Sequence, residues 1–318
     1  MSDAPRVSIV IPVYNEEANL PELHERLART LEAMGKPWEC IYVDDGSSDG
    51  SLAILTGLAA RDPRVRVVEF NRNYGQHAAV FAGMTQTRGD IVVTLDADLQ
   101  NPPEEIPRLV AKMEEGYDVV GSFRKNRKDP LFRRIASRLM NAMVRGGPGA
   151  AAGMTDYGCM LRAYVRNVVD QIGRCRELSS FIPLLAMQYA KKTAEIPVEH
   201  AERARGRSAY GFLRLLRLQL DLTTGFSLLP LRLLSAFGGF VALGALALAA
   251  FIFVRRLLPG GDQWAQFGVF TLFAILFLMV GGLFVGLGIL GEYVGRIYGE
   301  VRGRPRYVIR RIHGGSPG

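Results

Sequence analysis

Residues Ile91–Gln100 have the sequence IVVTLDADLQ, an apolar run that ends in two aspartates one residue apart. The same pattern occurs in Val7–Glu17 (VSIVIPVYNEE) and in Cys40–Gly50 (CIYVDDGSSDG), where a short β-branched run leads directly into acidic, amide or glycine residues. Short runs rich in valine and isoleucine, bounded by turn residues, predict strands. Each of these strands is therefore expected to end in polar side chains.

Further runs of this kind alternate with segments of helical periodicity. The predicted strands are residues 7–12, 40–44, 65–70, 91–96 and 118–123, and the predicted helices are 16–34, 51–60, 77–88 and 104–115. Apolar strands separated by helices predict an α/β domain, residues 1–205, whose mostly parallel sheet is covered on both faces. Ligands bind outside the carboxyl ends of the strands in such sheets, so the polar ends of the first four strands predict one site.

The end of the fourth strand is the candidate metal site. Asp96 and Asp98 present two carboxylates, and Gln100 adds an amide oxygen. Such oxygen ligands suit Mg²⁺ or Mn²⁺, and the ion would bridge a diphosphate. An isolated Asp-x-Asp is usually a solvated turn, but its position after a predicted central strand favours the metal.

The end of the second strand allows two interpretations. Asp44 or Asp45 can accept a hydrogen bond from a nucleobase N–H or a ribose hydroxyl. The next five residues, Gly46–Gly50, match the G-x-S-x-G turn of serine hydrolases. The downstream histidine of this domain, His200, lies in the charged stretch HAERARGR, which disfavours a hydrolase.

Basic residues follow the fifth strand. Arg124 and Arg133 belong to a cluster of seven lysines and arginines between residues 124 and 138. The cluster is either a solvated basic face or a phosphate-binding site, and the residues alone leave both interpretations open.

Two long apolar runs lie in the second half of the chain. Residues 233–254 and 267–291 carry no charge, and at about 1.5 Å per residue each helix would cross a hydrocarbon core of about 30 Å. The runs predict two transmembrane helices, preceded by amphipathic juxtamembrane helices (206–232) and followed by a cytoplasmic basic tail (292–318). Only Arg255 and Arg256 are basic in the intervening hairpin, whereas both flanks are arginine-rich, so both termini are expected in the cytoplasm.

Glycines recur in the second apolar run. Gly286–Gly291 (GLGILG) matches a dinucleotide-binding pattern but has no preceding strand, so the glycines instead indicate close helix packing. The same spacing makes self-association into a homo-oligomer reasonable.

The composition excludes several classes of protein. Lysine and arginine total 39 and aspartate and glutamate 31, giving a net charge of +8, and 48% of the residues are hydrophobic, which excludes a disordered polymer. The basic residues flank the apolar runs and face an anionic leaflet, so no nucleic acid is needed to explain them. Three cysteines without a C-x-x-C pair predict neither a disulfide framework nor a structural zinc site, and no secretory signal is evident.

Longer motifs resemble a known family. VSIVIPVYNEE, YVDDGSSDGS, NRNYGQH, TLDADLQNPPEEIP, DYGCMLRAY and LGEYVGRIYGEVRGRPRY together resemble the family 2 glycosyltransferases with a GT-A domain, and within them the polyprenyl-phosphate glycosyltransferases. The resemblance covers nearly the whole chain, and no Q-x-x-R-W motif of the processive synthases occurs.

The resemblance implies an enzyme of the bacterial inner membrane that transfers a sugar from a UDP donor to undecaprenyl phosphate, with inversion. NYGQH and DYGCMLRAY favour 4-deoxy-4-formamido-L-arabinose, a sugar used in lipid A modification and polymyxin resistance, over glucose. The alternatives left open are transfer of another hexose, such as glucose, and a non-catalytic membrane subunit that binds sugar lipids.

The resemblance also implies roles for individual residues. Asp98 and Asp156 are implied to act in catalysis. Nucleotide binding is implied for Pro12, Tyr14, Glu16, Asp44, Asp45 and Asp96. Pro12, Tyr14 and Glu16 would hold the uridine, Asp44 or Asp45 would bind the uracil or ribose, and Asp96 would act at the diphosphate. The lipid phosphate is expected at Arg124, Arg133 and Ser137, and the position of Gln76 and His77 after the third strand makes them candidates for the donor sugar. A histidine that merely caps the following helix is the alternative for His77.

Overall fold

The computed structural model describes residues 5–124, 159–175, 181–199, 229–257 and 265–315. These residues divide into two compact units. The first contains the described residues up to Glu199 together with those from Arg304 onward, and the second contains two long helices. Each unit is described by itself.

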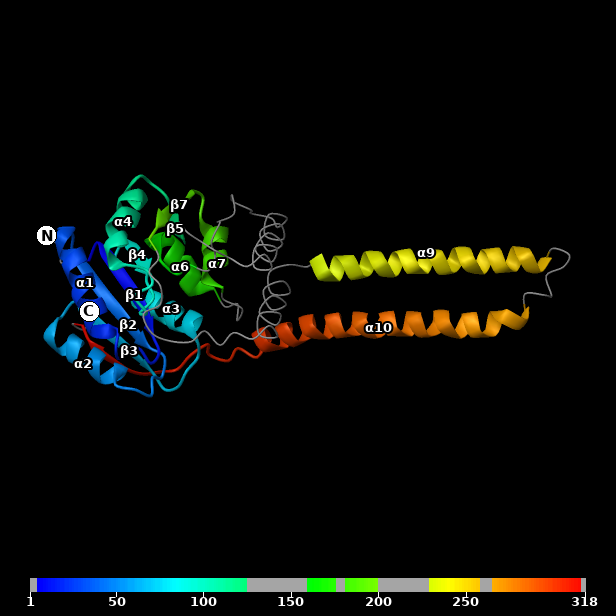
Figure 1. The fold of residues 1–318 in the computed structure, drawn as a ribbon, viewed down its shortest axis with the longest axis horizontal. Helices are drawn as coiled ribbons and strands as arrows, with labels where there is room; N and C mark the ends of the chain where they lie inside the picture. Colours follow the sequence, from blue (N-terminus) through cyan, green and yellow to red (C-terminus); the bar gives the residue numbers. More distant parts are fainter. Residues whose placement is uncertain (1–4, 125–158, 176–180, 200–228, 258–264, 316–318) are drawn as a thin grey trace. The chain divides into compact units, whose positions relative to one another are not determined.

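An eight-stranded sheet forms the centre of the first unit (Figure 1). Its order is β7-β5-β6-β4-β1-β2-β3-β8. The strands are β1 (Val7–Val13), β2 (Trp38–Asp44), β3 (Val65–Phe70), β4 (Ile91–Thr94), β5 (Val119–Arg124), β6 (Arg162–Val165), β7 (Thr193–Val198) and β8 (Ile309–Gly314). The central strands β4, β1, β2 and β3 are mutually parallel, so their carboxyl ends meet at one edge of the sheet.

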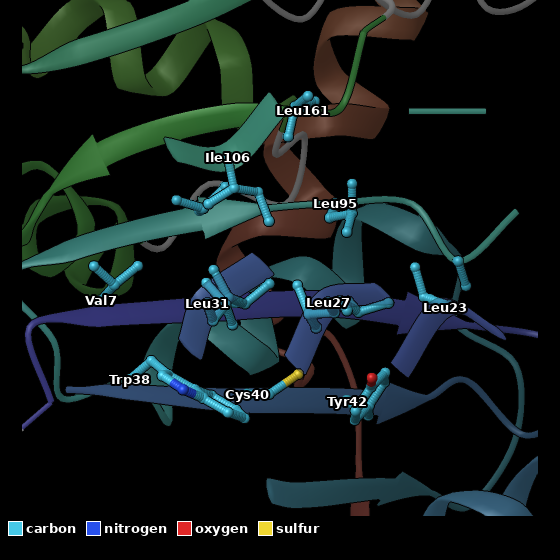
Figure 2. Close-up of a cluster of buried hydrophobic side chains, with 14 of the residues drawn as sticks. Val7, Leu23, Leu27, Leu31, Trp38, Cys40, Tyr42, Leu95, Ile106 and Leu161 are labelled. Carbon is cyan, nitrogen blue, oxygen red and sulfur yellow. The ribbon is translucent and has the colours of Figure 1, made fainter. Parts of the chain in front are cut away.

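Helices cover both faces of this sheet. They are α1 (Leu20–Ala33), α2 (Ser51–Arg61), α3 (Gln76–Thr85), the 3₁₀ turn η1 (Pro103–Glu105), α4 (Ile106–Glu114), α6 (Arg166–Arg174) and α7 (Ile182–Tyr189). Figure 2 shows Leu23, Leu27 and Leu31 of α1 lined up beside Trp38, Cys40 and Tyr42 of β2 within the larger core cluster. The opposite face of β2 and β3 packs on α3 through Ala79 and Ala82. Burial of aliphatic side chains on both faces stabilises the sheet and fixes the strand ends that carry the site.

The five predicted strands and four predicted helices are all present, with ends displaced by a few residues. The sheet is less parallel than expected, because β6 pairs antiparallel with β4 and β5, and β8 pairs antiparallel with β3. β6, β7 and β8 were not predicted from the sequence. β6 has only four residues, and the β8 sequence IRRIHG places two arginines side by side, which hides its strand pattern.

The second unit contains α9 (Leu229–Leu257) and α10 (Ala265–Val301). Ile275–Gly299 of α10 is the one stretch of the described residues that is long and apolar enough to cross a membrane, with a mean hydropathy of 2.1. In α9 the apolar helical segment Leu234–Gly244 is shorter, so the predicted first span at residues 233–254 stays a prediction. A Cβ on Gly286 would lie 3.4 Å from a Leu234 methyl group, which is an ordinary van der Waals distance, so the helices contact each other here without requiring a glycine.

The segment predicted as a basic tail, residues 292–318, has two parts in the structure. The helix α10 continues to Val301, and Ile309–Gly314 then joins the sheet of the first unit as the edge strand β8. A strand that covers the edge of a sheet removes unpaired backbone groups from solvent.

Candidate active site

The ends of β1, β2 and β4 and the loop after β3 form the candidate site. Because the four strands are parallel, the residues that follow them gather at one edge, as the sequence predicted. The side chains there differ in burial and in their hydrogen bonds. These differences distinguish side chains that stabilise the loops from those that can bind a ligand.

Asp45 fixes the loop after β3. Its two carboxylate oxygens accept hydrogen bonds from the backbone N–H groups of Tyr74 (2.6 Å) and Gly75 (2.8 Å). The residue is only 3% exposed, and burial raises the pKa of its carboxyl group, although both hydrogen bonds oppose the rise. Asp45 therefore connects the end of β2 to the loop that leads into α3.

Asp44 has an unused acceptor. One oxygen accepts a hydrogen bond from the Ser47 backbone N–H at 3.3 Å, whereas Oδ1 is buried and has no partner among the described residues. The side chain is 1% exposed, and burial raises the pKa of this carboxyl group as well. Buried acceptors normally have hydrogen-bond partners. Of the two adjacent aspartates, Asp44 is therefore the one that can accept a further hydrogen bond.

The turns after β1 and β2 are tied together. Asn15, which has a positive φ of 56°, donates its backbone N–H to Ser47 Oγ at 3.1 Å and accepts one from the Ser48 backbone N–H at 2.8 Å. The Ser48 hydroxyl also contacts Asn15 Oδ1 at 3.3 Å, so within the described residues its partner is an amide and not the histidine that a serine hydrolase requires. Asn15 and Ser47 were not among the predicted site residues, although an asparagine next to a strand end is the signal for such a left-handed turn.

The three residues predicted to hold uridine near β1 have different environments. Pro12 is buried within β1, and Tyr14 is 49% exposed at the strand end. Glu16 accepts a hydrogen bond from Asn19 Nδ2 at 2.6 Å, and its backbone N–H donates to Ser51 Oγ. Tyr14 thus presents an exposed aromatic ring beside the turns, while Pro12 and Glu16 lie within their framework.

Asp96, Asp98 and Gln100 follow β4 closely, in a turn where Leu99 has a positive φ of 60°. Asp98 Oδ1 accepts the Gln100 backbone N–H at 3.1 Å. Asp96 Oδ1 accepts a hydrogen bond from Gln76 Nε2 at 2.5 Å, which joins the start of α3 to the end of β4. Gln76, predicted to contact the donor sugar, therefore lies at the predicted metal ligand.

This arrangement suits a divalent cation that a substrate helps to bind. Within the described ranges, no three or more histidine, cysteine, aspartate or glutamate side chains are grouped so that they could hold a metal ion by themselves. Mg²⁺ commonly uses only one or two carboxylates together with substrate phosphates and water. Two half-buried carboxylates on one turn fit that requirement.

His77 is the second residue of α3, and its ring packs edge-on against Phe181 at a centroid distance of 5.2 Å. Its Nδ1 atom is buried without a hydrogen-bond partner among the described residues, and burial lowers the pKa of the imidazole. No side chain caps the start of α3, so His77 does not cap that helix.

Several predicted residues fall outside what the structure describes. Asp156, Arg133 and Ser137 lie in the range 125–158, and only the backbone of Arg124 is described, at the end of β5. The motif that contains Asp156 ends in the described part of the chain at Arg162, which is 1% exposed and donates from Nε to the Cys159 carbonyl oxygen at 2.8 Å. The sequence analysis did not single out Arg162, although a buried arginine always needs partners.

Comparisons with known proteins show what this chain is similar to. The family described as "Glycosyl transferase family 2" matches residues 8–173. The undecaprenyl-phosphate 4-deoxy-4-formamido-L-arabinose transferases of Salmonella paratyphi B and Salmonella enteritidis PT4 are each 52% identical over 308 residues, covering 96% of this chain and 93% of theirs. Glucosyl-3-phosphoglycerate synthase from Mycobacterium tuberculosis, in complex with phosphoglyceric acid, is 22% identical with a TM-score of 0.49, over 70% of this chain and 79% of that one. The chain belongs to glycosyl transferase family 2.

Proposed function

We propose that this glycosyltransferase moves 4-deoxy-4-formamido-L-arabinose from UDP to undecaprenyl phosphate. One observation carries the proposal: the 52% identity to transferases of that name extends over 96% of the chain. It therefore spans the strand-end site and both long helices. A match of that extent favours a shared substrate pair over a shared fold alone.

In this proposal the uridine occupies the turns after β1 and β2. Asp44, with its unpaired buried oxygen, accepts the hydrogen bond from the uracil or ribose, and Asp45 supports the neighbouring loop. Tyr14 offers an exposed ring for stacking on the base, on a framework set by Pro12 and Glu16.

Asp96, Asp98 and Gln100 are proposed to hold Mg²⁺ or Mn²⁺ at the end of β4. When bound, the ion would supply positive charge to the UDP leaving group. Gln76 already donates to Asp96 and thereby orients that carboxylate. His77, which follows Gln76 at the start of α3, is proposed to border the donor sugar with Gln76.

The chemistry then requires little proton transfer. The phosphate of the lipid is largely ionised at neutral pH, by analogy with phosphorylated side chains whose second pKa is about 6. One of its oxygens attacks the anomeric carbon while the bond from that carbon to UDP breaks, which inverts the centre. Arg124, Arg133 and Ser137 are proposed to align the lipid phosphate, and Asp156 to orient the acceptor or stabilise positive charge on the sugar.

We further propose that α9 and α10 anchor the enzyme in the bacterial inner membrane, with its catalytic domain and both termini cytoplasmic. The apolar stretch Ile275–Gly299 supports the α10 part of this topology. Glycine-spaced helices of this kind also favour a homo-oligomer.

The decisive experiment combines purified full-length protein, a short-chain polyprenyl phosphate and a panel of UDP-sugars, with products read by mass spectrometry. We expect transfer of the formamido-arabinose in preference to glucose, and dependence on Mn²⁺ or Mg²⁺. A preference for UDP-glucose would overturn the donor assignment. Absence of transfer from every donor, together with absence of UDP binding, would overturn the proposed function and favour a binding subunit.

Asp98→Asn tests the metal role in the same assay. We expect turnover to fall roughly a hundredfold or more, because charge on the leaving group loses its compensation. Asp90→Asn is the matched control, since Asp90 lies beside the amino end of β4 and pairs with Arg6 there. Wild-type turnover of the Asp98→Asn enzyme in the presence of a chelator would contradict the proposal.

A further inference from the structure

The chain that follows α10 returns to the first unit and packs beside the proposed UDP-sugar site. β8 extends the sheet by pairing antiparallel with β3, from Arg66 opposite Gly314 to Phe70 opposite Ile309. The backbone N–H of Asn71, the first residue of the loop after β3, donates to the Val308 carbonyl oxygen at 3.3 Å. The returning segment thus meets the loop that Asp45 holds.

Tyr307 connects that segment to the loop through stacked rings. Its ring stacks on Phe70 with a centroid distance of 5.1 Å and an interplanar angle of 12°. Phe70 in turn contacts Tyr74 edge-on at 5.6 Å, and the backbone N–H of Tyr74 donates to Asp45. A continuous series of contacts therefore leads from Tyr307 to the carboxylate at the end of β2.

Arg306 makes a second connection, to α3. Its guanidinium lies over the Phe81 ring at 4.2 Å from the centroid and donates from Nη2 to the Cys175 carbonyl oxygen at 2.7 Å. Phe81 belongs to α3, whose first residue, Gln76, donates to Asp96. The cation–π contact and the hydrogen bond therefore connect the returning segment to α3 and to the end of α6.

Covering the edge of β3 does not by itself require these contacts. Backbone pairing by residues 309–314 already protects the edge, and Ile312 on that strand is 43% exposed. Arg306 and Tyr307 precede the strand. Arg306 contacts Phe81 of α3, and Tyr307 contacts Phe70, the β3 residue that packs on Tyr74.

We propose that Arg306 and Tyr307 are positioning residues for the UDP-sugar site. They hold the loop after β3 and the start of α3 in the geometry that pairs Asp45 with Tyr74 and Gly75, and Asp96 with Gln76. The inference rests on the proposed function, because it assigns these residues to the donor and not to the lipid acceptor. It also means that the polypeptide after the long apolar helix completes the nucleotide site.

The test compares Tyr307→Ala with Tyr307→Phe in the full-length protein. UDP binding with Mn²⁺ is measured by calorimetry, and KM is measured separately for the UDP-sugar and for polyprenyl phosphate. We expect Tyr307→Ala to weaken UDP binding roughly threefold to tenfold, the loss expected for an aromatic pair, and to raise the donor KM alone. Tyr307→Phe keeps the stacked ring and should bind UDP as the wild type does.

Ile312→Ala on β8 is the control for general destabilisation, and thermal unfolding is recorded for each variant. If Tyr307→Ala does not fold, Tyr307→Leu, which retains an apolar side chain without the ring, replaces it with the same expectation. Unchanged UDP binding in the variant that lacks the ring would overturn the inference, as would an equal loss in Ile312→Ala or an equal rise in both KM values. A wild-type protein that does not bind UDP would overturn the proposed function instead.

Discussion

Asp44 and Asp45 are adjacent and equally buried, yet they have different tasks. Both carboxylate oxygens of Asp45 accept hydrogen bonds from backbone N–H groups of the loop after β3, whereas Asp44 Oδ1 has no partner among the described residues. A buried carboxylate without a full set of donors costs stability, which a binding site recovers when its ligand supplies the missing donor. The structure therefore separates a buried acceptor that has no partner among the described residues from one whose two oxygens are both paired.

Substitution of each aspartate by asparagine should separate these tasks. Burial raises the pKa of Asp44, so the folded state holds its proton more tightly than the unfolded state does. The contribution of Asp44 to the free energy of unfolding is therefore greatest at low pH and is lost as the pH rises above the ordinary carboxyl pKa of about 3.9. We expect Asp44→Asn to keep or raise the Tm at pH 7 while UDP affinity falls about tenfold or more.

Asp45→Asn is the matched comparison. An amide has one acceptor oxygen, so the N–H of Tyr74 or Gly75 would lose its partner, at a cost of about 1–3 kcal/mol. We expect a lower Tm at pH 7, measured by differential scanning calorimetry. If Asp44→Asn proved the less stable of the two variants, the division of tasks would be wrong.

His77 should make stability depend on pH in the opposite direction. Burial lowers the pKa of its imidazole, so the unfolded state binds a proton near pH 6.5 while the folded state does not. Its contribution is present above about pH 6.5 and is lost as the pH falls below that value. We expect the drop in Tm between pH 7.5 and pH 5.5 to be smaller in His77→Phe than in the wild type.

His24 remains in that variant, and burial lowers its pKa as well, so part of the pH dependence should persist. A drop in Tm identical to that of the wild type would show that the environment of His77 is not the buried one described.

At the scale of elements, local sequence predicted the central sheet because the strand pattern there is undisturbed. β1, β2 and β4 are near-continuous apolar runs that end in polar residues, and both features are visible without the structure. β8 was not predictable, since its partner β3 lies about 240 residues earlier in the chain and its two arginines mask the pattern. The separate tasks of Asp44 and Asp45 were also hidden, because they depend on a loop that starts at Asn71.

The turn after β2 depends on Gly46. This residue has φ +69°, and a Cβ there would lie 2.5 Å from the Arg72 carbonyl carbon, so the backbones of two turns touch at this point. We expect Gly46→Ala to lower the free energy of unfolding by several kcal/mol and to reduce UDP binding, measured by chemical denaturation and calorimetry. Gly35→Ala is the control, because Gly35 also has a positive φ (63°) but open space around its Cβ position.

Gly35→Ala should therefore cost only the strain of a left-handed alanine, about 1–2 kcal/mol, and leave UDP binding unchanged. Equal losses in the two variants would mean that backbone conformation alone, and not the contact with Arg72, makes Gly46 necessary.

At the scale of the whole molecule, the first unit contains the strand-end site and the second contains α9 and α10. The chain crosses between the units twice, since the described residues from Arg304 onward belong to the first. The second unit exposes leucine and phenylalanine side chains along α10, including Leu276, Phe277 and Leu283. Exposure of so many large apolar groups on one helix is expected where lipid is the solvent.

Charges placed within α10 should release the protein from membranes. Leu276 and Leu283 lie within the apolar stretch Ile275–Gly299 and are exposed in the structure. An arginine at the centre of a membrane helix raises the free energy of membrane insertion by about 2.5–3.5 kcal/mol. The double variant Leu276→Arg/Leu283→Arg should therefore leave the membrane pellet after ultracentrifugation and appear in the soluble or aggregated fraction. Val301→Arg, at the end of α10, is the matched control, because a terminal arginine can reach the headgroups and should leave the protein in the pellet. Membrane retention of the double variant in a carbonate wash would show that an intact apolar stretch in α10 is not needed for anchoring and that another part of the chain, such as α9, suffices.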